Sequence, residues 1–343
     1  MKKRKKVLAS LLAATMVVSM SLTALAAEVS TNNGQDLTGH LDVEKAISKT
    51  YTVNSGEAPN ETFAFKFTAE NYKNTSGEVV SGVTIPALTN VTIAFDTTNG
   101  FEGNTTTLTN NITSIEAENY PELGFYTYKV EEVIPSSKTQ GVGYTEKPLY
   151  LIVTILRDEA GDKHYVAALH YETETGTKSN GFENTYDSGS LTVSKTIVGN
   201  MASLTDRFTF TVTFEAADGC QILSDIKVPE NVTKTDGKYE YTFTLSNAES
   251  VTFNNIPAGA TYTVSENTTS VDTNTVYNKI EENYSDDSKT ISAGDQDTVA
   301  FKNEKTNAVD TGIILDSAPY VLLLALAAAG MFAVVNKKRE EEF

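Results

Sequence analysis

Short segments in which apolar and polar residues alternate make up most of the chain between residues 41 and 304. Clear examples lie at 62–67, 150–156, 208–214 and 239–245. Apolar residues at every second position indicate strands with one buried face, whereas the 3.6-residue period of amphipathic helices is scarce here. Clusters of Asn, Asp, Ser and Gly separate the segments and are typical of turns. The pattern predicts an all-β fold built as a sandwich.

Four short motifs occur twice along the chain, each time in the same order. Each copy begins with Leu-x-Val-x-Lys-x-Ile, continues with Phe-x-Phe and Tyr-x-Val-x-Glu, and ends with Phe-x-Asn. An ordered repeat of this kind indicates a duplicated domain. We therefore expect one sandwich over residues 27–184, a linker over 185–190 and a second sandwich over 191–304. The motifs begin at 41, 63, 128 and 182 in the first copy and at 191, 208, 262 and 301 in the second.

Each copy carries a lysine, a glutamate and an asparagine at positions whose neighbours two residues away are apolar. Side chains two residues apart in a strand share a face, so all three are predicted to point into the core. In the first copy Lys49 is an alternative to Lys45, because it shares that face and lies nearer the Phe-x-Phe strand. The two predicted sets are Lys45, Glu132 and Asn184, and Lys195, Glu266 and Asn303.

Three polar side chains in an apolar core are costly unless they satisfy one another. One interpretation is a buried Lys–Glu ion pair with a hydrogen bond to the asparagine. The other interpretation is covalent, because burial favours a neutral, nucleophilic lysine and a protonated glutamate. Such a glutamate could polarise the asparagine amide and pass a proton to departing ammonia, which leaves a Lys–Asn isopeptide bond.

Both ends of the chain carry segments that indicate export to the cell surface. A basic stretch, an apolar run over 7–20 and Ala-Leu-Ala at 24–26 predict a signal peptide over residues 1–26. The other end has an apolar run over 319–335 followed by basic residues, which predicts a transmembrane segment and tail over 313–343. Thr311 and Gly312 stand just before it, in a region over 305–312 that resembles a sortase sorting signal.

Composition narrows the possible functions. The 343 residues include 27 Lys and Arg against 45 Asp and Glu, a net charge of −18, which argues against a nucleic-acid partner. The single cysteine, Cys220, cannot form an internal disulfide, and the three histidines lack a metal-binding spacing. We therefore expect no metal or other cofactor, and no enzyme beyond the chemistry that the chain performs on itself.

The paired motifs, together with the signal peptide and sorting tail, resemble the backbone pilins of Gram-positive bacteria, of the streptococcal T-antigen type. The resemblance implies immunoglobulin-like, CnaB-type domains, each with a self-generated Lys–Asn isopeptide bond promoted by a glutamate. It places the bonds at Lys45–Asn184 and Lys195–Asn303, with Glu132 and Glu266 as their promoters.

The resemblance also implies how subunits would be joined outside the cell. A pilus sortase would cut between Thr311 and Gly312 and link Thr311 to a lysine of the next identical subunit, in a fibre attached to cell-wall peptidoglycan. The acceptor in this type lies near the end of the first domain, where Lys178 is the candidate, with Lys138 and Lys163 next. The alternative function is a monomeric, wall-anchored adhesin that binds a host or microbial ligand and needs no acceptor lysine.

Overall fold

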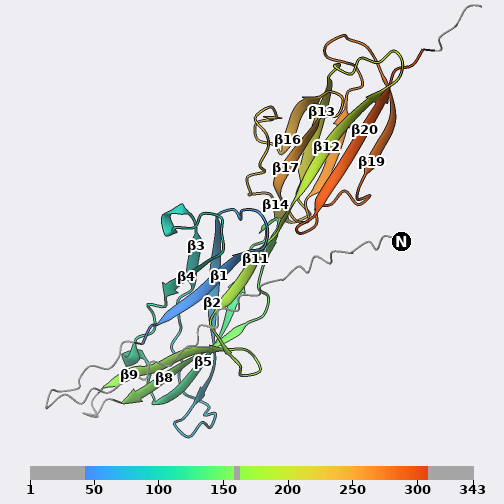
Figure 1. Cartoon of the computed structure of the whole chain (residues 1–343). Coiled ribbons are helices and arrows are strands. Elements are labelled where there is room, and N and C mark those ends of the chain that lie inside the picture. Colours follow the sequence, from blue (N-terminus) through green and yellow to red (C-terminus); the bar gives the residue numbers. More distant parts are fainter. Residues whose placement is uncertain (1–42, 158–162, 308–343) are drawn as a thin grey trace, which may run out of the picture. The chain divides into compact units, whose positions relative to one another are not determined.

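The structure, a computed structural model, describes residues 43–157 and 163–307. Within these ranges strands dominate, and the helical elements are two short 3-10 turns, η1 (Thr97–Asn99) and η2 (Ala117–Asn119). The strands form two sandwiches that follow each other along the chain (Figure 1). The predicted all-β fold is therefore confirmed. No helix in the described part of the chain is long and apolar enough to span a membrane.

The first sandwich consists of a four-stranded and a six-stranded sheet. The strand order is β4-β1-β11-β7 in the smaller sheet and β10-β9-β8-β5-β2-β3 in the larger. The strands are β1 (Ala46–Val53), β2 (Glu61–Lys73), β3 (Val91–Phe95), β4 (Thr106–Asn111), β5 (Gly124–Val133), β7 (Val142–Gly143), β8 (Leu149–Arg157), β9 (His164–Glu172), β10 (Lys178–Ser179) and β11 (Phe182–Tyr186).

The second sandwich consists of two four-stranded sheets. Their strand orders are β17-β12-β20-β19 and β15-β16-β13-β18. The strands are β12 (Ser188–Val198), β13 (Phe208–Glu215), β15 (Thr233–Lys234), β16 (Glu240–Leu245), β17 (Ser250–Pro257), β18 (Thr261–Glu266), β19 (Asn278–Tyr284) and β20 (Gln296–Glu304). Two further short strands, β6 (Lys138–Thr139) and β14 (Cys220–Gln221), pair in parallel with each other.

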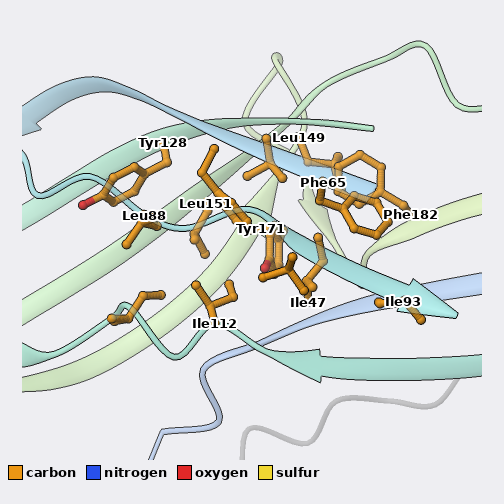
Figure 2. Close-up of a cluster of buried hydrophobic side chains, with 14 of the residues drawn as sticks. Ile47, Phe65, Leu88, Ile93, Ile112, Tyr128, Leu149, Leu151, Tyr171 and Phe182 are labelled. Atoms are coloured by element: carbon orange, nitrogen blue, oxygen red, sulfur yellow. The ribbon is translucent and has the colours of Figure 1, made fainter. Parts of the chain in front are cut away.

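Strand alternation places an apolar core between the sheets of each sandwich. Along β5, buried and partly buried residues alternate over nine consecutive positions, as the period of two in the sequence predicts. The first core is rich in aromatic residues, and Phe65 and Phe182 lie side by side with ring centroids 4.9 Å apart (Figure 2). Because these two rings come from opposite sheets, they tie the last strand of the domain to the larger sheet.

The first and last strands of each sandwich are parallel neighbours (Figure 1). β1 pairs with β11, and Tyr51 lies opposite Asn184. β12 pairs with β20, and Ile197 lies opposite Asn303. The two pairings have the same register, since each asparagine lies opposite the residue two positions after a lysine.

The expected linker over 185–190 differs from what the structure shows. β11 continues to Tyr186 and β12 already begins at Ser188, so Asp187 alone separates the two strands. The turn-forming residues Asp, Ser and Gly suggested a loop here. Ladder hydrogen bonds to the neighbouring strands outweigh that local preference, because β12 pairs with β17 from Ser188 onward. Of the first predicted domain, residues 27–42 lie outside the described ranges.

Candidate functional site

The first sandwich buries a cluster of Lys49, Glu132 and Asn184, here called the first triad. The Lys49 ammonium nitrogen donates to Glu132 Oε2 at 2.6 Å, and both side chains are fully buried. Asn184 Nδ2 donates to the other carboxylate oxygen, Oε1, also at 2.6 Å. Glu132 comes from β5, across the core from β1 and β11, so it bridges the lysine and the asparagine.

Lys45, the lysine placed in this site from its motif, lies elsewhere. It precedes β1 and is half-buried, and its backbone carbonyl accepts the Ile112 N–H. The predicted face was right, since Ile47 and Lys49 follow at steps of two and are fully buried. The motif match chose a lysine four residues too early in the sequence. Lys49, the alternative that the sequence left open, is the lysine that contacts Glu132. The spacing from Lys49 to Phe63 nearly equals that from Lys195 to Phe208, so this spacing carried the signal.

The second sandwich buries Lys195, Glu266 and Asn303, here called the second triad, as the sequence predicted. Lys195 Nζ donates to Glu266 Oε1 at 2.5 Å, and both side chains are fully buried. Asn303 Nδ2 donates to the same oxygen at 2.8 Å. Glu266 ends β18, in the sheet facing the one that holds the other two residues.

One aromatic ring lies at the same distance from each of the two lysines. Lys49 Nζ lies 4.6 Å from the centroid of Phe63, and Lys195 Nζ lies 4.6 Å from that of Phe208. These rings are the first members of the two Phe-x-Phe motifs. The second members, Phe65 and Phe210, lie opposite Glu132 and Glu266 in the strand ladders. The repeated Phe-x-Phe therefore places one ring against each lysine and one beside each glutamate.

Burial shifts the pKa of both lysines and of Glu266. Removal from water lowers the pKa of Lys49 from 10.5 to about 8, although the neighbouring Glu132 carboxylate opposes this shift. Burial likewise lowers the pKa of Lys195 and raises the pKa of Glu266, and the attraction within that pair only partly offsets both shifts. A low lysine pKa favours the neutral amine, which is the nucleophilic form.

The two asparagines differ in what their carbonyl oxygens contact. Asn184 Oδ1 accepts the Thr145 backbone N–H at 2.9 Å and the Thr145 hydroxyl at 2.8 Å. Asn303 Oδ1 is buried without a hydrogen-bond partner, and so is Glu266 Oε2. Sequence reasoning missed Thr145, because it follows the two-residue strand β7 and carries no alternation or motif.

The proposed polymerisation residues fall in different places. Lys178 is exposed in the short edge strand β10, opposite Glu172 of β9. Its neighbours Thr177 and Ser179 line a groove of about 710 Å³ that extends to Glu183. Thr311 and Gly312, together with the predicted signal peptide and transmembrane segment, lie outside the described residues.

Comparisons with known proteins match both sandwiches. Residues 41–187 match the Spy0128-like isopeptide containing domain, and residues 189–305 match a domain of unknown function, DUF7601. A pilin of Streptococcus pyogenes serotype M1 is 28% identical over 298 residues, which is 82% of this chain and 86% of that protein. The pilus tip adhesin Cpa of Streptococcus pyogenes is 34% identical over 128 residues, 37% of this chain and 18% of the adhesin.

A solved structure shows the same fold. The crystal structure of the major pilin from Streptococcus pyogenes superposes with a TM-score of 0.53 at 22% sequence identity, over 76% of this chain and 98% of that one. The resemblance predicted from the paired motifs is thus confirmed by sequence and by fold. Residues 41–187 match the Spy0128-like isopeptide containing domain, and the comparisons support a pilus subunit whose sequence is similar to a streptococcal pilin over most of the chain.

Proposed function

We propose that this chain is the shaft subunit of a covalent pilus on the surface of a Gram-positive bacterium, with an internal Lys–Asn isopeptide bond in each sandwich. The observation that carries this proposal is the pair of buried triads. Both link the first strand of a sandwich to its last, in the same register and with the glutamate on the facing sheet. A duplicated fold could bury apolar residues at these positions at less cost, so the repeated polar set indicates a chemical role.

The bond would form by exchange of one amine for another. The neutral lysine Nζ attacks the asparagine Cγ, and the C–Nδ2 bond then breaks. One proton moves from Nζ through the glutamate to Nδ2, which leaves as ammonia, and the glutamate ends as it began. The product is a secondary amide plus one ammonia. We propose no catalysis beyond this reaction, which the chain performs once on itself without a cofactor.

Such bonds would suit a fibre under tension. Tension that enters through the first strand of a sandwich would leave through the last, its parallel neighbour, without separating the strands between them. The bonds would close the chain segments from Lys49 to Asn184 and from Lys195 to Asn303, which make up most of each sandwich. Closing a loop on the order of 100 residues stabilises a fold by about 5 kcal/mol through the entropy of the unfolded chain. The bonds would thus serve where the single cysteine allows no disulfide.

The intact mass of the purified ectodomain tests the internal bonds. Each condensation releases one ammonia, so we expect a mass about 34 Da below the sequence mass, or about 17 Da for each bond. Tryptic peptides should join Lys49 to Asn184 and Lys195 to Asn303. A mass equal to that of the sequence would leave buried ion pairs as the correct interpretation.

We further propose that a pilus sortase joins Thr311 of one subunit to Lys178 of the next, giving a head-to-tail fibre whose base is attached to peptidoglycan. The exposure of Lys178 beside a groove supports this choice of acceptor. With its cognate sortase, the wild-type ectodomain that retains residues 305–312 should form a covalent ladder. Lys178→Ala should form none while keeping both internal bonds, and Lys138→Ala serves as the matched control.

Two results would change this second proposal. A ladder from Lys178→Ala would move the acceptor to another lysine, Lys138 or Lys163. No ladder from the wild type would favour the monomeric adhesin, a function suggested by the partial similarity to a pilus tip adhesin.

A further inference from the structure

We propose that Thr145 forms an oxyanion site for the reaction of Asn184, and that the second domain has no counterpart to it. This inference rests on the proposed isopeptide chemistry and adds a catalytic residue to it. Attack on the Asn184 amide turns its carbonyl oxygen into an alkoxide before ammonia leaves. Donors already aimed at that oxygen would lower the barrier, because they bind the transition state more strongly than the ground state.

The geometry at Asn184 fixes which amide atom faces which partner. The Thr145 backbone N–H can only donate, so the Asn184 atom 2.9 Å from it must be the oxygen, Oδ1. The amide nitrogen, Nδ2, then faces Glu132 Oε1 at 2.6 Å. The atom that becomes negative therefore lies against two donors, and the atom that leaves as ammonia lies against the proton carrier.

The Thr145 hydroxyl is placed to respond as charge develops. It lies 2.8 Å from Asn184 Oδ1 and also within hydrogen-bonding distance of the Glu183 backbone carbonyl. A hydroxyl has one proton, so these two oxygens compete for it. A negative Oδ1 is the stronger acceptor, and the proton shifts toward it as the tetrahedral intermediate forms. This preference for the transition state is what accelerates a reaction.

The second triad has no such donor among the described residues. Asn303 Oδ1 is buried and unpartnered, so no N–H fixes the orientation of that amide. Glu266 is the acidic side chain that contacts this amide, and its Oε2 is also unpartnered. Glu266 would therefore carry the proton without a separate donor for the oxyanion, whereas in the first domain Thr145 supplies that donor.

The test follows bond formation over time in the full chain, made by cell-free translation and sampled from minutes to hours. Tryptic peptides are quantified by mass spectrometry, and the rate at which the Lys195–Asn303 link forms serves as an internal reference. Thr145→Val keeps the shape and the backbone N–H but removes the hydroxyl, so the Lys49–Asn184 link should form about 10²-fold more slowly. Thr145→Ser should restore most of the rate. The rate at which the Lys195–Asn303 link forms should not change in either variant.

A second measurement separates chemistry from folding. Thr145→Val in an Asn184→Ala chain, which cannot form the first bond, should leave the melting temperature nearly unchanged. A first-domain link that forms at the wild-type rate in Thr145→Val would overturn the role of Thr145 alone. Equal slowing by Val and Ser would do the same, because it would point to packing. Absence of any link in the wild type would instead overturn the proposed function and this role with it.

Discussion

The two triads share a backbone arrangement but differ in how completely their polar atoms are satisfied. In the first, Glu132 uses both oxygens and Asn184 Oδ1 has two donors from Thr145. In the second, one oxygen of Glu266 accepts both bonds, and Asn303 Oδ1 accepts none. Strand pairing thus determines which residues meet, whereas loop residues outside the repeat determine which hydrogen bonds the reacting atoms receive.

The charged residues near the two triads also differ. Glu183, beside the first triad, raises the pKa of Lys49 and so opposes the effect of burial. Lys279, which pairs with Asn303 in the strand ladder, lowers the pKa of Lys195 and adds to that effect. An equivalent position in a duplicated fold therefore does not guarantee equivalent reactivity, and each domain has to be tested by itself.

The largest expected effect comes from removing either lysine. Lys49→Ala and Lys195→Ala should each abolish one bond, restore about 17 Da to the mass and lower the unfolding free energy of that domain by about 5 kcal/mol. The glutamate left buried without its partner should add to the loss. Chemical denaturation with limited proteolysis measures both domains. Equal stability of wild type and variant would contradict the covalent interpretation.

Removing the glutamate should affect bond formation differently in the two domains. Glu132→Ala should slow the first bond by roughly 10² to 10⁴-fold, because the proton carrier is lost while Thr145 still binds the oxyanion. Glu266→Ala should leave no detectable second bond, since it removes the proton carrier from a site that has no counterpart to Thr145. The yield of each cross-linked peptide after prolonged incubation measures this difference. A second bond that forms faster than the first would reverse the comparison.

A chain without the first bond should reveal the buried amine through its pH dependence. In Asn184→Ala, Lys49 binds a proton in the folded state only below about pH 8, whereas the unfolded chain holds it up to about 10.5. Between these values the unfolded state binds more protons, so the unfolding free energy should rise from pH 8 to 9.5 by about 1 to 2 kcal/mol.

The matched control for this pH dependence is the double variant Lys49→Met/Asn184→Ala, in which the rise should be absent. Unfolded tyrosines, with a pKa of about 10, are already partly ionised at pH 9.5, and the control chain carries the same tyrosines. Identical curves for the two chains would show that the amine keeps an ordinary pKa in the fold.

The smallest effect is expected at Lys45. Because this half-buried residue lies outside β1 and away from the first triad, Lys45→Ala should change stability by no more than about 0.5 kcal/mol. The first bond should form as in the wild type, as judged by intact mass. Loss of the bond in this variant would show that Lys45, the lysine that the motif first indicated, forms it.

The sequence by itself determined the all-β class, the duplication and every triad residue except the first lysine. The alternation of apolar residues is a local property, so it reveals which face of a strand is buried without any knowledge of the partner strand. Alternation could not choose between Lys45 and Lys49, because it predicts both on the same face. The spacing to the Phe-x-Phe motif was the signal that distinguished them.

Tertiary structure decided that choice and supplied Thr145. Which lysine meets Glu132 depends on how β5 lies across the core from β1, and this contact joins residues 83 positions apart. Thr145 reaches Asn184 across 39 positions, from a segment that follows a two-residue strand. Contacts of this kind are set by the packing of two sheets, and the periodicity within a single strand does not reveal them.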